Sequence, residues 1–312
     1  MSQGKPLVSI GIPVYNGENY ISGAIESILL QTFTDFELII SDNASTDRTQ
    51  IICEDYALKD KRIRYYRNEK NLGASKNFNC LFGLSLGKYF KWAAHDDMIA
   101  PDFLEKCVKI MENNPDIVLT YAKTLAINEF KNTQEKIPYE LALTEDSAAE
   151  RFKHFMKVFR YDALACDPIM GLMRSEAFRE VRPLGKFIAS DMILLCEMAL
   201  RGKFYEIGEH IYIKRVHPLM SRKKNPTVQE MARWFDPSAN IKIQFPQWRL
   251  LKEYLLVISE APISFFAKSF CYYEIIRWTI FTSKTFGADV VKAAIQVYRI
   301  VQFRLKPENA FE

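Results

Sequence analysis

Two adjacent aspartates are the strongest sign of chemistry in this sequence. Asp96 and Asp97 follow His95 at the end of an apolar run at 89–94. Two carboxylates about 5 Å apart repel each other by roughly 3 kcal/mol at an effective dielectric constant of about 20, and a divalent cation removes that repulsion. Oxygen ligands suit Mg²⁺ or Mn²⁺, and such a cation can bridge carboxylates to a diphosphate. The alternative is a solvated helix start, because acidic residues ahead of Pro101 also suit the positive end of a helix dipole.

A second acidic position could recognise a ligand. Asp42 ends another apolar run and begins the segment Asp-Asn-Ala-Ser-Thr-Asp. A carboxylate there can accept a hydrogen bond from a base N–H or a ribose hydroxyl. Ser45, Thr46 and Asp47 are more typical of a helix cap. Asp42 is therefore the better candidate for binding.

The elements that position these residues alternate between strand and helix over the first 130 positions. Apolar runs at 8–14, 37–41, 63–67, 89–94 and 117–126 predict strands, and helical spacing predicts helices between them. This alternation indicates βαβ crossovers and a mainly parallel sheet with both faces covered. Ligands bind beyond the carboxyl ends of such strands. The polar residues expected there are Asn16, Glu18, Asp42, Asn43, Asn71, Gly73, His95, Asp96 and Asp97.

Beyond Asn128 the pattern changes. The segment 131–146 is polar and predicts a loop, and 148–159 predicts an amphipathic helix. Segments 168–174 and 203–213 read as strands, and nearly everything from about 228 onward is compatible with helix.

Four motifs in order resemble family 2 glycosyltransferases, which have the GT-A fold. Val-Ser-Ile-Gly-Ile-Pro-Val-Tyr-Asn-Gly-Glu at 8–18 resembles the family's opening signature, and Ser-Asp-Asn-Ala-Ser-Thr-Asp at 41–47 its nucleotide-base motif. Asn71-Leu72-Gly73, Asn79 and Gly87-Lys88-Tyr89 then precede His95-Asp96-Asp97. The resemblance is strong over about 6–128, thinner to about 237 and absent from the tail. It implies an α/β fold with a Rossmann-like, mainly parallel sheet flanked by helices, and a helical C-terminal extension.

The resemblance also implies an activity. Such enzymes move a sugar from a nucleotide-sugar donor, most often UDP-linked, to a hydroxyl of a glycan, glycolipid or glycoprotein acceptor, usually with inversion of the anomeric centre. The reaction needs a base near the acceptor hydroxyl and a metal, Mn²⁺ or Mg²⁺, at the leaving diphosphate. Residues 1–128 would form the donor-binding half, 129–238 the acceptor-binding half and 239–312 the helical extension.

Individual roles follow from the resemblance. Asp42 would read the base, and Asp191, near the start of an expected helix, would be the catalytic base unless it is only a helix cap. The segment 215–222 is similar to a later family segment whose His and Ser approach the diphosphate, and Lys223 and Lys224 extend it into a basic loop. The expected donor-site residues are Pro13, Tyr15, Glu18, Asp42, Asn71, Gly73, His95, Asp96, Arg215, His217 and Ser221. The expected metal ligands are Asp96, Asp97 and His217.

The sequence departs from the family pattern at three places. Ala94 replaces an acidic residue that touches the ribose in many relatives, His95 stands where small or polar residues are usual, and Phe78 stands where an Arg is common. These departures leave open a second hypothesis, a GT-A-fold nucleotide-binding or scaffold protein without turnover. A nucleotidyltransferase is a third hypothesis, which a Gly-rich basic loop after the first strand would favour. The turn there is instead Tyr-Asn-Gly-Glu.

Composition limits the remaining possibilities. The 312 residues carry a net charge of only +4, too balanced for a dedicated nucleic-acid binder, and that whole excess lies in 240–312. Six scattered cysteines without a CxxC motif predict buried thiols in a reducing compartment. We identify no signal peptide and no apolar stretch of about 20 residues, so a cytoplasmic location is expected. The aromatic tail is either a helical packing or homodimer surface, or an interfacial helix at a membrane that carries a lipid-linked acceptor.

Overall fold

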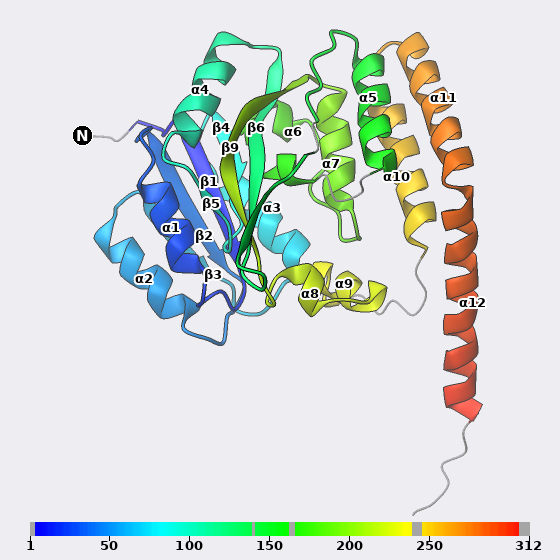
Figure 1. The fold of residues 1–312 in the computed structure, drawn as a ribbon, viewed down its shortest axis with the longest axis horizontal. Coiled ribbons are helices and arrows are strands. Elements are labelled where there is room, and N and C mark those ends of the chain that lie inside the picture. The colour runs from blue at the N-terminus through cyan, green and yellow to red at the C-terminus, as the bar shows by residue number, and fades with distance from the viewer. Residues whose placement is uncertain (1–3, 139–140, 162–165, 239–244, 306–312) are drawn as a thin grey trace, which may run out of the picture.

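A nine-stranded sheet runs through the part of the chain that the computed structural model describes, residues 4–138, 141–161, 166–238 and 245–305 (Figure 1). The strand order is β3-β2-β1-β4-β8-β6-β9-β5, with β7 paired to β6. The strands are β1 (Val8–Val14), β2 (Phe36–Asp42), β3 (Ile63–Arg67), β4 (Tyr89–Trp92), β5 (Met98–Ile99), β6 (Ile117–Asn128), β7 (Thr133–Lys136), β8 (Leu172–Arg174) and β9 (Lys203–Val216).

Helices cover the sheet and continue beyond it into a C-terminal group of three. The helices are α1 (Ile21–Leu29), α2 (Thr49–Lys59), α3 (Ala74–Leu84), α4 (Phe103–Asn113), α5 (Ala148–Tyr161), α6 (Ser175–Arg179), α7 (Ser190–Ala199), α8 (Ser221–Lys224), α9 (Val228–Phe235), α10 (Pro246–Glu260), α11 (Phe265–Phe281) and α12 (Ser283–Leu305). None of the helices in the described ranges is long and apolar enough to cross a membrane.

The predicted α/β fold with a helical extension is confirmed. All residues of β1 and β2 are buried, which explains why their sequences read as continuous apolar runs rather than as alternating patterns. β1 pairs in parallel with β2 and β4, and β2 with β3, so the carboxyl ends of these strands meet at one edge. The register places Val14 beside Asp42 at that edge.

Two segments differ from the sequence prediction. The segment 168–174, expected to be one strand, begins as a 3₁₀ turn (Asp167–Met170) and pairs only as β8, antiparallel to β4 and β6. Pro168 explains the difference, since it lacks the N–H that a strand in mid-sheet must donate. The expected loop at 131–146 contains β7, which forms a hairpin with β6.

The extension shares a hydrophobic core with the body. Tyr254 and Trp278 of the extension lie in the same buried cluster as Phe155 of α5 and Leu195 of α7. Five of the six cysteines are buried and Cys80 is partly buried, and all are free thiols, as predicted.

An arginine clamp also joins the extension to the body. Arg182 donates from its backbone and guanidinium to Glu197 of α7, and its Nη1 donates to Glu253 of α10 at 3.0 Å. Both carboxylates are almost fully buried. Buried carboxylates are costly unless they are paired, so this clamp couples the two parts of the molecule.

We expect Arg182→Met to lower the free energy of unfolding by about 3 kcal/mol, because Glu197 loses its pairing cation and Glu253 keeps only Arg249. Urea unfolding followed by circular dichroism measures this loss. Lys59→Met is the matched control: its partner Asp55 is exposed, and the expected loss is below about 0.5 kcal/mol. An equal loss of unfolding free energy in the two variants would show that the Arg182 ion pairs do not stabilise the fold.

Candidate functional site

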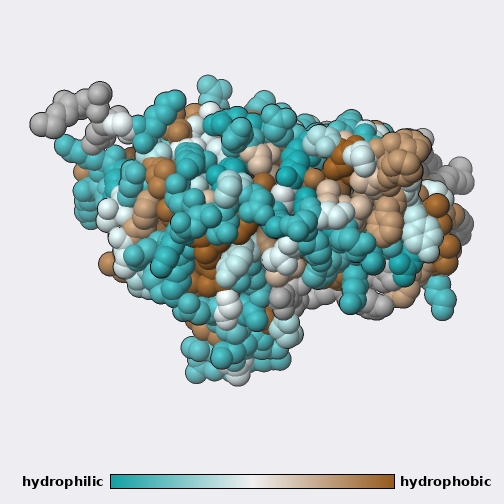
Figure 2. Space-filling model, turned by 90° about the horizontal axis from the view of Figure 1, so that it is seen from above, coloured by the Kyte–Doolittle hydropathy of each residue, from teal (hydrophilic) through white to brown (hydrophobic). Residues whose placement is uncertain are grey.

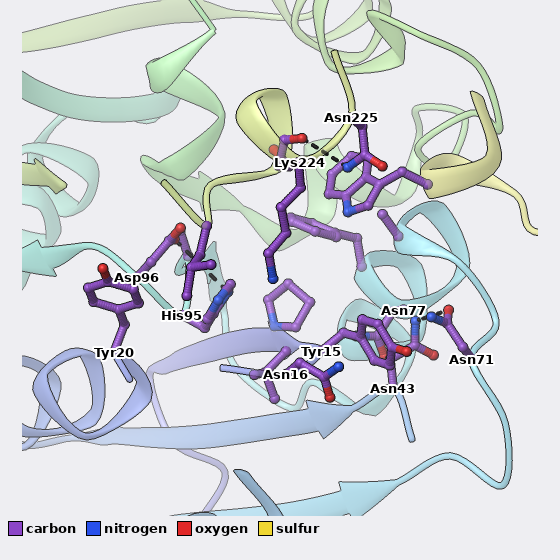
Figure 3. A pocket seen from close by; sticks show the side chains of 18 of the residues that line it. Tyr15, Asn16, Tyr20, Asn43, Asn71, Asn77, His95, Asp96, Lys224 and Asn225 are labelled. Carbon is purple, nitrogen blue, oxygen red and sulfur yellow. Dashed lines mark hydrogen bonds and ion pairs between the residues drawn. The ribbon is translucent and has the colours of Figure 1, made fainter. Parts of the chain in front are cut away.

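A cavity of about 550 Å³ opens beyond the carboxyl ends of β1, β2 and β4 (Figure 3). Asp96 lies at one end of the cavity, and the amides of Asn43, Asn71 and Asn77 lie at the other. Six of the predicted donor-site residues line it, namely Pro13, Tyr15, Asn71, His95, Asp96 and Ser221. The cavity therefore lies at the sheet edge where the sequence predicted a ligand.

His217 holds the Asp96 carboxylate from behind. Its Nε2 lies 3.0 Å from Asp96 Oδ2, and the backbone N–H of Leu219 donates to its Nδ1 at 3.2 Å. An Nδ1 that accepts leaves the ring proton on Nε2, which then donates to Asp96. The ring is 1% exposed and packs on Tyr20, with ring centroids 4.0 Å apart. His217 thus fixes Asp96 without itself lining the cavity.

Asp97 points away from the cavity and is bonded by β9. Its Oδ2 accepts a hydrogen bond from the Tyr212 hydroxyl, and its Oδ1 accepts one from the backbone N–H of Arg215 at 2.9 Å. Both carboxylate oxygens are therefore in use. Arg215, which the sequence predicted at the donor site, does not line the cavity: its backbone N–H donates to Asp97, and its guanidinium lies over the Tyr20 ring.

The pKa values of the two neighbouring carboxylates are shifted in opposite directions. Burial raises the pKa of Asp97, and the charge of Asp96 raises it further, against the hydrogen bonds from Tyr212 and Arg215. Burial would also raise the pKa of Asp96, but the nearby His95 and the hydrogen bond from His217 outweigh it and hold the pKa below its usual range. Asp96 is therefore the carboxylate that stays negative and faces the cavity.

At the other end of the cavity, Asn43 is the residue at the carboxyl end of β2 that lines the cavity, and Asp42 does not line it. Asp42 is fully buried, and its oxygens accept from the Ser45 N–H and the Tyr65 hydroxyl, each at 2.8 Å. Asp42 therefore does not line the cavity, whereas its neighbour Asn43 does, and the reading of a base by Asp42 stays a prediction. A strand buried on both faces shows no alternation, so its sequence could not indicate which of two successive polar residues faces the ligand.

The amide orientations at this end are fixed by backbone partners. Asn43 Oδ1 accepts from the Leu72 N–H at 2.9 Å, and Asn71 Oδ1 accepts from the Gly73 N–H at 2.8 Å. Asn43 Nδ2 then donates to Asn71 Oδ1 at 2.9 Å. Asn71 Nδ2 has no acceptor among the described residues. This end of the cavity therefore offers amide donors, while its amide oxygens are already bonded.

Two other predicted site residues support the cavity rather than line it. Glu18 accepts from the backbone N–H of Arg48 at 2.9 Å and so stabilises the start of α2. Gly73 has a φ of +83°, and a Cβ there would lie 2.5 Å from the Phe235 carbonyl oxygen and from Pro237. Gly73 thus lets the end of α9 pack closely on the start of α3.

The roof of the cavity comes from α8, α9 and their flanking residues. The sequence predicted a basic loop here, and Figure 3 shows Lys224 of α8 extending into the cavity. α9 was not predicted as part of the site, although a capping box of Thr227 and Glu230 marks its start. Together these elements place Leu219, Ser221, Lys224, Asn225, Glu230, Arg233, Trp234 and Pro237 on the cavity.

Asp191 lies at the start of α7, outside the cavity lining. Its Oδ1 accepts from the Met192 N–H at 3.0 Å. Burial raises the pKa of Asp191, against hydrogen bonds from Met192 and Cys166 and the charge of Arg222. A partly exposed carboxylate whose pKa is raised above its ordinary value is suited to accept a proton.

Asp96 fits one kind of cation site. The described residues contain no group of three His, Cys, Asp or Glu side chains that could enclose a metal. Mg²⁺ and Mn²⁺ are commonly held by one or two carboxylates together with substrate phosphates and water. Asp96 meets that need, whereas Asp97 and the Nε2 of His217 are already bonded within the protein.

The first part of the chain matches known glycosyltransferase sequences. The model of glycosyl transferase family 2 matches residues 9–182, more than half of the chain. An uncharacterized glycosyltransferase of Methanocaldococcus jannaschii is 35% identical over 188 residues, which cover 60% of this chain and 62% of the relative. The glycosyltransferase GlyG of Streptococcus pneumoniae is 30% identical over 36% of this chain and 38% of its own length. The chain thus matches less than two thirds of the length of these relatives.

Solved structures show the same fold at low sequence identity. S. aureus TarS 1–349 in complex with UDP-GlcNAc superposes with a TM-score of 0.61 and 17% identity, over 87% of this chain and 72% of that one. The mannosyltransferase PcManGT from Pyrobaculum calidifontis, in complex with GDP-Man and Mn²⁺, superposes with a TM-score of 0.52 and 14% identity, over 94% of this chain and 87% of that one.

We expect Gly73→Ala to loosen the roof, because the added Cβ collides with the end of α9. Hydrogen–deuterium exchange should rise in α9, and the melting temperature should fall. Gly83→Ala is the matched control, since a Cβ there meets nothing within 4 Å and alanine favours the α3 helix by about 0.5–1 kcal/mol. Unchanged exchange in α9 of Gly73→Ala would show that this contact does not hold the roof.

Proposed function

This chain belongs to glycosyltransferase family 2, and we propose that it transfers a sugar from a nucleoside diphosphate donor in the cavity to an acceptor hydroxyl beside Asp191. The observation that carries the proposal is the polarity of the cavity. A negative carboxylate held by His217 lies at one end, neutral amide donors lie at the other, and Lys224 and Arg233 lie on the roof. A nucleotide has the complementary order of diphosphate, ribose and base.

We assign the diphosphate to the Asp96 end. Asp96 would hold a divalent cation, Mn²⁺ or Mg²⁺, whose remaining ligands come from the donor phosphates and water. When bound, the cation neutralises the charge that develops on the leaving diphosphate. Lys224 and Arg233 supply further positive charge on the roof. His217 orients Asp96 by a direct hydrogen bond, and Asp97 does so through the backbone that the two aspartates share. We therefore place Asp97 and His217 behind the ligand and not on it.

The base then extends toward Asn43 and Asn71. In a pyrimidine nucleoside the group on C4 lies opposite the ribose, and in a purine the group on C6 is also far from it. The free donor of Asn71 Nδ2 matches a carbonyl at that position, because the neighbouring amide oxygens are already bonded. Uracil and guanine carry a carbonyl there, whereas cytosine and adenine carry an amine. Among pyrimidine donors, this favours a UDP-sugar.

Asp191 is the proposed general base of an inverting displacement. The acceptor hydroxyl gives its proton to the Asp191 carboxylate as its oxygen bonds to the anomeric carbon of the donor. The bond between that carbon and the diphosphate oxygen breaks, and its electron pair leaves with the diphosphate. The acceptor attacks from the side opposite the leaving group, so the anomeric configuration inverts. A glycan, a glycolipid or a glycoprotein each offers the hydroxyl that this step needs.

One observation keeps a second function in view. Ala94 lines the cavity where many relatives carry an acidic residue near the ribose. A chain that binds nucleotides without turnover would fit that loss. Release of sugar from a UDP-sugar by the wild type, and not by Asp191→Asn, distinguishes the enzyme from such a binding protein.

We expect the wild-type protein to bind UDP at least about tenfold more tightly than CDP, because a cytosine amine would face the Asn71 donor. Asn71→Asp keeps an oxygen for the Gly73 N–H and replaces the free donor with an acceptor. It should therefore lower the ratio of UDP to CDP affinity below one. Isothermal titration calorimetry with Mn²⁺ present measures both affinities. Equal affinities would contradict the base assignment, and no binding of either nucleotide would contradict the proposed function.

We expect Asp191→Asn to lower kcat by about 10²–10⁴-fold while leaving UDP affinity unchanged, because it removes a base that lies outside the donor cavity. In the wild type, the raised pKa places the acidic limb of the kcat profile above the ordinary aspartate value of 3.8, and activity falls as Asp191 becomes protonated. Asp35→Asn, an exposed change before β2, is the control and should alter neither quantity. A normal kcat in Asp191→Asn would exclude it as the base.

A further inference from the structure

Exposed apolar side chains gather on α11 and α12, outside the lining of the cavity. We define the α11–α12 face by the large exposed apolar residues of these two helices, which are Phe265, Phe266, Tyr273, Ile276, Ile280, Phe281, Val290, Val291 and Ile295. Phe265 and Phe266 are 79% and 84% exposed, and Ile280 is 69% exposed. Figure 2 shows apolar side chains gathered at the end of the molecule where α11 and α12 lie. Exposed apolar surface of this extent marks an interaction site.

Within each helix, most of these exposed residues lie on one side. Positions 266, 273, 276 and 280 are seven, three and four residues apart, which places them on one side of α11. The opposite side buries Cys271, Ile275 and Trp278 in the shared core. Positions 284, 288, 291 and 295 are four, three and four residues apart and so share one side of α12, whose Phe286 and Ala293 are buried. The exposed apolar side chains are thus surplus to what the fold needs.

Among the described side chains of α11 and α12, the exposed charged groups are positive. Arg277, Lys284 and Lys292 are exposed on α11 and α12. The two acidic residues among the side chains described there, Glu274 and Asp289, are buried. Glu274 accepts from Arg277 at 2.9 Å, and Asp289 accepts from the backbone N–H of Gln247 at 2.7 Å. Exposed aromatic and aliphatic groups flanked by cations are the pattern of a helix that lies in a membrane interface.

We propose that the α11–α12 face binds the surface of an anionic lipid bilayer. Phe265, Phe266 and Ile280 enter the boundary between headgroups and acyl chains, and Lys284 and Lys292 contact the anionic headgroups. A second copy of the chain fits this face less well, because pairing the face with itself would bring cations against cations. The helices lie along the surface, in keeping with the finding that none of those described could span a bilayer.

The test is sedimentation of the full chain with lipid vesicles. The wild type should sediment with vesicles of phosphatidylcholine and phosphatidylglycerol, and much less with phosphatidylcholine alone. Phe265→Ser with Phe266→Ser should weaken binding at least about tenfold. Leu30→Ser with Leu58→Ser is the matched control: these side chains are also highly exposed but lie on the α1–α2 side, and binding should not change.

The charge is tested separately. Lys284→Gln with Lys292→Gln should weaken binding by about fivefold for each lysine lost and reduce its dependence on salt. Every variant changes exposed side chains, and circular dichroism and UDP affinity should match the wild type. The proposal is overturned if the wild type does not sediment with the anionic vesicles, or if the phenylalanine pair binds them as well as the wild type does. It is also overturned if light scattering shows a dimer that the phenylalanine pair disrupts.

Discussion

Two carboxylates at successive positions have to coexist at the end of β4, and the way β9 separates them determines the rest of the site. Tyr212 and the backbone of Arg215 bond both oxygens of Asp97, and His217 bonds Asp96 from behind. The repulsion between the two groups is divided unequally, so the pKa of Asp97 rises while that of Asp96 falls. One negative charge is therefore presented to the cavity in a fixed position.

β9 consequently connects the acidic end of the cavity with the roof of the cavity. It pairs in parallel with β6 and continues through His217 into α8 and α9, which roof the cavity. Gly73 lets that roof come down onto α3, and Lys224 enters the cavity from it. The residues before β6 thus supply the floor and the amide end of the cavity, and β9 with His217 supplies the groups that bond Asp96 and Asp97. Arg182 and the shared hydrophobic core attach the extension, which carries the α11–α12 face, to the body.

The sequence could predict the front of the fold because βαβ units have strong local signals. It could also predict the importance of Asp96, since adjacent carboxylates after a buried strand are unusual. It could not show that Asn43 and not Asp42 faces the cavity, because β2 is buried on both faces. Nor could it show that Asp97 and Arg215 bond each other, since 118 residues separate them. The role of α9 depends on a long-range contact with Gly73, which no local pattern records.

We propose that Asp96 receives the diphosphate of a nucleotide whose base points to Asn71. Crystals soaked with UDP and Mn²⁺ test it most directly through the anomalous difference map of manganese. We expect one manganese peak between the Asp96 carboxylate and the diphosphate, with uracil O4 within hydrogen-bond distance of Asn71 Nδ2. A nucleotide bound in the reverse direction, or manganese bound away from Asp96, would contradict it.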